Sequence, residues 1–158
     1  MTHCIIIKRD ELQQQIDLRN HYMGEAAKRK DFDADTLQSS TDDKELFVMF
    51  VQRALNELTS TVALRFPSIT HKIGKNYIEV AFDTKSDVPP HILPLLKQSI
   101  TDYLVNETIL QWLLLRQPML AQPNMAIKAT LHNNVQQQFA KIYNNHRLHR
   151  RATDLAGI

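Results

Sequence analysis

The sequence predicts a mainly α-helical protein, a compact helical bundle of about four helices with one β-hairpin and extended termini. Apolar residues recur at spacings of three and four over several long segments, which is the period of a helix with one buried face. Only 3 Gly and 6 Pro occur in 158 residues, and so few turn-forming residues disfavour an all-β chain. The chain length fits one domain with a core of its own.

We expect that single domain to span residues 1–158, with an extended N-terminal arm at 1–9, a helical core at 10–145 and a basic C-terminal tail at 146–158. The arm contains a β-branched run that favours an extended strand. A strand at the end of a chain can pair with, or be swapped onto, another chain. We therefore predict that the run contributes to an interface through Ile5, Ile6 and Ile7.

Two helices are expected after the arm. The first spans about 11–30, with Asp10 as its N-cap and only a thin apolar stripe. The second begins after a capping residue, Asp42, is strongly amphipathic and ends near Arg65. Between them, the charged and Ser-rich stretch 31–41 predicts an exposed loop.

A β-hairpin is predicted at about 69–83, around the turn Gly74-Lys75-Asn76. Residues after the turn alternate, so two sets are expected on opposite faces: Tyr77, Glu79 and Ala81 on one, and Ile78, Val80 and Phe82 on the other. An isolated hairpin is marginally stable in water. It should therefore pack on the helices or add strands from another subunit.

The most hydrophobic helix is expected at about 90–117, with Pro90 in its first turn, where the missing N–H costs nothing. We assign Trp112 to the core; an anchor in a subunit interface is the alternative. After a proline-bounded connector, Asn124 can cap a last helix that runs to about Tyr143. No segment is apolar over the ~20 residues that would span a membrane.

Motifs for catalysis or for cofactors are missing from the sequence. There is no GxSxG, GxxxxGK[ST] or GxGxxG motif. Cys4 is the only cysteine, so no internal disulfide forms, and its apolar neighbours predict a thiol that is inert or has a raised pKa. The histidines form no HExxH pair, and no CxxC could complete a metal site. We expect no enzymatic activity, no cofactor and no bound metal.

The basic tail contributes four further candidate interface residues, Arg147, His149, Arg150 and Arg151. A disordered, solubilising terminus is the alternative interpretation of this stretch.

The order of elements resembles the tailed-bacteriophage head-to-tail connector proteins, the neck adaptors that form rings between portal and tail. The resemblance is carried by the helix with His21-Tyr22-Met23-Gly24-Glu25, the helix at 45–55, the hairpin at 69–82, the helix at 99–112 and the closing helix with its basic end at 143–151. It is a pattern of elements and hydrophobic positions and covers most of the chain. The linker at 31–41 and the connector at 118–124 have no counterpart in it.

The resemblance implies a non-enzymatic virion protein, made in the host cytoplasm, that forms a homo-oligomeric ring in the neck between capsid and tail. Its implied partners are the portal protein and adjacent neck or tail proteins. The basic segment with Arg147, His149, Arg150 and Arg151 would then face the DNA in the lumen or an acidic portal surface. Ring symmetry and the exact neck layer do not follow from it.

A small helical DNA-binding or regulatory protein is the competing hypothesis. It would use the basic tail together with the cluster Lys28-Arg29-Lys30. The net charge of +2 is small for this class, and the expected pI above ~9 is not reached.

Overall fold

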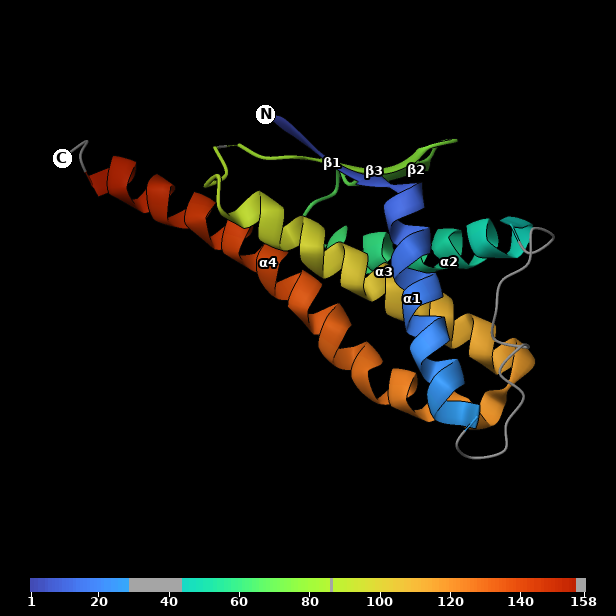
Figure 1. The fold of residues 1–158 in the computed structure, drawn as a ribbon. Coiled ribbons are helices and arrows are strands. Elements are labelled where there is room, and N and C mark those ends of the chain that lie inside the picture. The colour runs from blue at the N-terminus through green and yellow to red at the C-terminus, as the bar shows by residue number, and fades with distance from the viewer. Residues whose placement is uncertain (29–43, 86, 156–158) are drawn as a thin grey trace.

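The computed structural model describes residues 1–28, 44–85 and 87–155, and it confirms the mainly α fold (Figure 1). Four α-helices accompany a small antiparallel sheet of three strands in the described part of the chain. In chain order the elements are β1 (Thr2–Lys8), α1 (Arg9–Lys28), α2 (Lys44–Val62), β2 (Thr70–Ile73), β3 (Tyr77–Asp83), α3 (Ile92–Arg116), the 3-10 turn η3 (Pro118–Leu120) and α4 (Gln122–Leu155).

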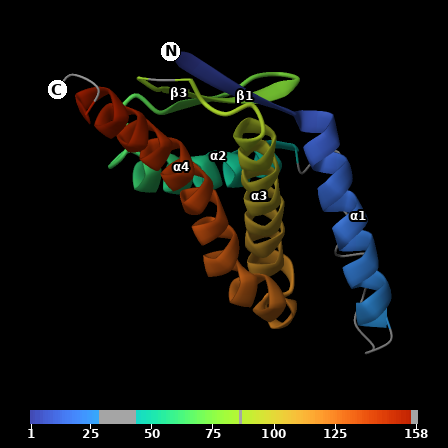
Figure 2. The ribbon, with the colours of Figure 1, turned by 90° about the vertical axis from the view of Figure 1, so that its left-hand side faces the viewer.

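Helix α3 lies at the centre of the molecule. Figure 2 shows α1 and α4 on opposite sides of α3, with the sheet across one end of the helices. Every residue from Tyr103 to Leu110 is buried, so this part of α3 is covered on all sides. Trp112 is 5% exposed, as expected for a core residue, and the Arg116 guanidinium lies 4.7 Å from the centre of its ring system.

The hairpin forms as predicted, and its inner face rests on the helices. Strand β3 buries Ile78, Val80 and Phe82, and turns the alternate residues outward. An aromatic cluster joins the sheet to α4, since Phe82 and Phe139 lie 5.2 Å apart in edge-to-face geometry and Phe66 contacts both rings. The sheet is thereby attached to the end of the helical layer.

The N-terminal segment corrects one expectation. The segment is extended, but β1 pairs antiparallel with β3 of the same chain, with Ile5 opposite Val80. Ile5 and Ile7 are 4% and 2% exposed, so both belong to this chain's own core, whereas Ile6 on the other face is 50% exposed. The physical reason is that β3 would otherwise leave a row of backbone hydrogen-bonding groups unpaired, and β1 pairs with them directly.

Several predicted helix ends were wrong by a few residues. Helix α1 begins at Arg9, so Asp10 lies in its first turn and is not the N-cap. Asp42 and the loop at 31–41 lie outside the described residues. Helix α2 ends at Val62 and closes with a turn in which Arg65 N–H donates to the Val62 carbonyl. Pro90 precedes α3, which starts at Ile92.

Helix α4 differs most from the prediction. It starts at Gln122, so Asn124 lies inside the helix and does not cap it. It also continues to Leu155, through the stretch expected as an extended basic tail. No Gly or Pro occurs between Pro123 and Gly157, so no residue there breaks the helix.

Candidate functional site

The predicted interface residues fall into two groups. Of the three isoleucines, only Ile6 is available on the surface, because Ile5 and Ile7 are core residues. The four basic residues lie on the α4 backbone and no longer form a tail; their side chains lie outside the described part: Arg147, His149, Arg150 and Arg151. The two groups belong to different elements, β1 and α4.

A cluster of charged side chains forms where α2, α3 and α4 meet. The ammonium of Lys128 on α4 lies 3.0 Å from Glu57 Oε2 on α2 and 3.2 Å from Glu107 Oε1 on α3. Gln111 donates a hydrogen bond to Glu107 at 2.9 Å, and Arg53 donates one to Gln111 at 3.2 Å. These five residues, which we call the three-helix junction, link three elements that are distant in sequence.

Burial within the junction is uneven. The Glu107 side chain is 1% exposed, and those of Lys128 and Glu57 are 30% and 42% exposed. Partial burial disfavours the charged form of Lys128, but hydrogen bonds to Glu57 and Glu107 outweigh it and raise its pKa. The ammonium is therefore held charged, which supplies the counter-charge that buried Glu107 requires.

Tyr103 and His132 lie against this junction. Burial raises the pKa of the Tyr103 phenol, and the neighbouring carboxylates of Glu57 and Glu107 raise it further. The rings of Tyr103 and His132 are 5.5 Å apart, and His132 Nε2 lies 3.4 Å from the Thr61 hydroxyl. Tyr103 and His132 thus adjoin the charged residues of the junction, on the side where α3 and α4 face each other.

Two other reactive side chains have local partners. The exposed Cys4 thiol has a pKa raised by partial desolvation and by Glu79, which confirms the expected direction. His71 lies 2.7 Å from Gln52 Nε2 and 3.3 Å from the Thr59 hydroxyl, and burial lowers its pKa. Among the side chains that the structure describes, no three His, Cys, Asp or Glu residues are placed to hold a metal ion.

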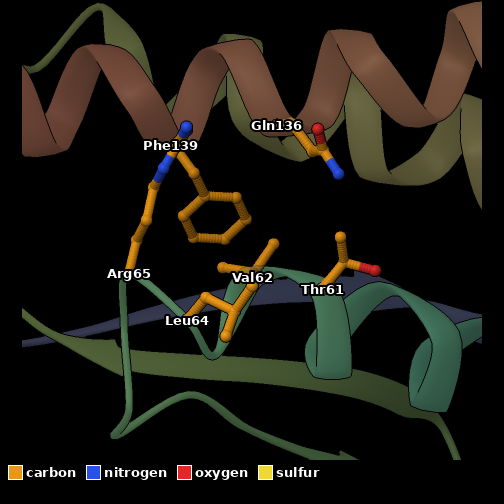
Figure 3. A pocket seen from close by; sticks show the side chains of 6 residues that line it. All are labelled: Thr61, Val62, Leu64, Arg65, Gln136 and Phe139. Carbon is orange, nitrogen blue, oxygen red and sulfur yellow. The ribbon is translucent and has the colours of Figure 1, made fainter.

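A small pocket lies between the end of α2 and the middle of α4 (Figure 3). Its volume is about 150 Å3, room for a few water-sized groups. Val62 and Phe139 form its apolar wall, while Gln136 and Thr61 point toward each other across it. The Arg65 side chain extends from the turn after α2 alongside Phe139.

Acidic residues are concentrated in the first two thirds of the chain, a feature on which no sequence-based prediction above depends. Between Glu107 and Asp154 the sequence has no acidic residue but six Lys and Arg, whereas residues 1–107 have sixteen Asp and Glu against thirteen Lys and Arg. This acid-free segment includes the whole of α4 up to position 153. Its described surface also presents Asn133, Asn134 and Gln137 to solvent.

In the described part of the chain, no helix has the length and apolarity needed to cross a membrane. Comparison with protein-family models, with curated proteins and with solved structures finds no significant match to this chain.

Sequence patterns missed the three-helix junction. Glu107 and Gln111 are spaced four apart in the most apolar helix, which was the available indication that α3 carries a buried polar site. The partners Glu57 and Lys128 lie 50 and 21 residues away from Glu107 along the chain, and no local pattern connects them.

Proposed function

We propose that this chain is a non-enzymatic structural protein that assembles into a ring as a head-to-tail connector of a phage particle, joining portal to tail. The observation that supports this best is the difference between its two flanks. Helix α4, which has no acidic residue before Asp154, lies on one side of α3, and α1 lies on the other (Figure 2). That the particle is a phage, and that the partners are the portal and tail proteins, is inferred from the resemblance in the order of elements.

The flank formed by α1 has the properties of a complementary surface. It exposes Leu18 and Tyr22, which are 54% and 65% exposed, and the carboxylates of Asp10 and Asp17. A helix of net positive charge on one side and an apolar, partly acidic face on the other favour contact between unlike surfaces of neighbouring copies. Such heterologous contacts close into a ring when the rotation between copies fits.

The test is the mass of the purified chain in solution, measured by light scattering at low and high salt, alone and with portal and tail proteins. A species larger than 18.3 kDa that dissociates at high salt is the expected result. Replacing Arg147, Arg150 and Arg151 with Ala should abolish it. The control replaces three exposed lysines of the sheet region, Lys72, Lys75 and Lys85, and should leave it intact.

A chain that stays monomeric at every salt concentration, alone and with both partners, would contradict this proposal.

A DNA-binding protein is the second candidate, favoured by the same acid-free segment. Along a helix, positions 147, 150 and 151 fall on one face, where three cations can follow a phosphate backbone. The logarithm of the DNA-binding constant should then fall linearly with the logarithm of the salt concentration. The triple Ala variant should have a shallower slope, by the amount that roughly three phosphate contacts contribute. Absence of DNA binding at low salt would remove this candidate.

A further inference from the structure

Strand β1 has a free edge. The strand order β1-β3-β2 leaves one side of β1 without a strand partner among the described residues. Its pairing with β3 is regular, from Thr2 opposite Asp83 to Lys8 opposite Tyr77, with no bulge and no proline. Soluble proteins usually protect such an edge with prolines, bulges or charges. On β1 the only full charge is Lys8, at its last position.

Hydrogen bonds at both ends of β1 show which residues face this edge. Met1 and Thr84 exchange two backbone bonds, of 2.7 and 2.8 Å, and Arg9 N–H donates to the Asn76 carbonyl at 3.0 Å. In an antiparallel pair such bonded positions alternate, so odd-numbered residues of β1 bond to β3. The remaining backbone groups point toward the free edge; they belong to Thr2, Cys4, Ile6 and Lys8.

The same four residues carry their side chains on the outer face of the sheet. All four are exposed, and Ile6 retains 50% exposure although it lies in the middle of the strand. The free edge of β1 therefore combines the outward-pointing backbone groups of Thr2, Cys4 and Ile6 and the Lys8 N–H with an apolar centre formed by Cys4 and Ile6. The Lys8 carbonyl is not among them, because it precedes α1 and accepts the first hydrogen bond of that helix. A strand added at this edge would form hydrogen bonds with these backbone groups and would cover the apolar centre.

We propose that the free edge of β1 pairs with β1 of a second copy of this chain, antiparallel about a two-fold axis at Ile5. Cys4 then lies opposite Ile6 of the second copy, and Thr2 lies opposite its Lys8. This register is the one in which all four outward-facing residues of each strand find a partner. A shift of two residues in either direction leaves Thr2 or Lys8 unpaired in each strand.

Side-chain chemistry agrees with this register. Each half-exposed Ile6 packs beside Cys4 of the other copy, which removes apolar surface from water. Each Lys8 lies next to Thr2 of the other copy, whose hydroxyl donates to Asp83 Oδ1 at 2.6 Å. The Lys8 ammonium, which lies 2.9 Å from Glu11 Oε1 of its own chain, is thus brought toward a second carboxylate on both sides of the axis.

Pairing between β1 and β2 of another copy is weaker on two grounds. Both strands run antiparallel to β3, so β1 and β2 are parallel to each other. In a head-to-tail repeat, β1 of one copy would therefore pair in parallel with β2 of the next copy, and parallel pairing is slightly less stable per residue. Strand β2 also has only four residues, Thr70–Ile73. The proposed two-fold pairing is independent of the head-to-tail contact, because it uses neither α1 nor α4.

Disulfide trapping tests the register. In an Ile6→Cys variant the new thiol faces Cys4 of the second copy, at a hydrogen-bonded position where Cα atoms are ~5.5 Å apart, a separation that suits a disulfide. Mild oxidation should give a covalent dimer several-fold more abundantly than in the wild type. A Lys72→Cys variant, with its added thiol on the outer face of β2, is the control for random collision and should not exceed the wild type.

Light scattering of Ile6→Lys tests the pairing without any added thiol. Ile6 contributes nothing to this chain's core, so the variant should fold, and its concentration-dependent dimer should be lost while the salt-sensitive head-to-tail species remains. The proposal is overturned if Ile6→Cys forms no more covalent dimer than Lys72→Cys. It is equally overturned if the wild type shows no dimer, or a dimer that Ile6→Lys leaves unchanged.

Discussion

Asn106 and Asn124 hydrogen-bond to each other inside the protein. The Asn124 side-chain amide donates to Asn106 Oδ1 at 2.9 Å, and the Asn106 amide donates to the Asn124 backbone carbonyl at 3.1 Å. Both residues are buried, with 0% and 8% exposure. The pair connects the middle of α3 with the first turn of α4, so it helps to fix the position at which α4 returns along α3.

Asn106→Ala should lower the free energy of unfolding by about 1–3 kcal/mol, because it leaves the buried Asn124 side-chain amide without its partner. Urea denaturation followed by circular dichroism measures the change. Asn134→Ala removes the same amide from an exposed position of α4 and should alter stability by less than ~0.5 kcal/mol. Equal losses in the two variants would show that the pair contributes nothing specific.

Lys128→Met should destabilise the fold by about 3 kcal/mol, since it leaves the Glu107 carboxylate buried without a counter-charge. Adding Glu107→Gln to that variant should recover part of the loss, because the uncompensated charge is then gone. The matched control is Lys141→Met on the exposed side of α4. A double variant no more stable than Lys128→Met would argue against a charge-based role.

Stability should fall at alkaline pH through Tyr103. Burial and two carboxylates raise its pKa, so the folded protein retains the phenol proton at a pH where the unfolded chain, with a pKa of ~10, has lost it. The free energy of unfolding then decreases as pH rises above ~10. Lys128, whose pKa is also raised, contributes with the same sign.

Tyr103→Phe should therefore show a shallower decline in stability above pH ~10 than the wild type, in urea titrations at a series of pH values. Tyr22→Phe, at a 65% exposed position, should retain the wild-type pH dependence. If the free energy of unfolding declines equally with pH in all three proteins, groups other than Tyr103 cause the loss of stability at alkaline pH.

The two faces of β1 should respond differently to truncation. Ile7→Ala should cost about 2–5 kcal/mol, because it leaves a cavity in the core, whereas Ile6→Ala in the monomer should cost less than ~0.5 kcal/mol. Thermal or urea unfolding at low protein concentration keeps the comparison free of self-association. Comparable losses at both positions would contradict the register of β1 on β3.

Local patterns predicted the parts of this fold that depend on neighbouring residues. Alternation along Tyr77–Asp83 correctly assigned both faces of the hairpin, and the spacing of apolar residues located α2 and α3. The assignment of Trp112 to the core is confirmed as well, since it is 5% exposed. The hydrophobic period of a helix or strand and the residue types of a turn depend only on residues close in sequence, so both can be recognised without a structure.

Contacts between distant residues could not be predicted in this way. Ile5 pairs with Val80 across 75 residues, and nothing in the β-branched run distinguishes an internal partner from another chain. The polar residues Asn106 and Glu107 have their partners, Asn124 and Lys128, on α4. Of the predicted interface residues, Ile6 stays on the surface, while the basic group of α4 remains a prediction.

The pairing of β1 with β3 has a consequence for biosynthesis. Strand β1 is synthesised about seventy residues before its partner β3, and closing a loop of that length carries an entropic cost that local elements avoid. Until then its isoleucines have no core to enter, and an unpaired apolar segment of this kind is prone to aggregate. A strand made well before its partner thus completes the sheet, and the time for which it stays unpaired depends on how quickly the hairpin is translated.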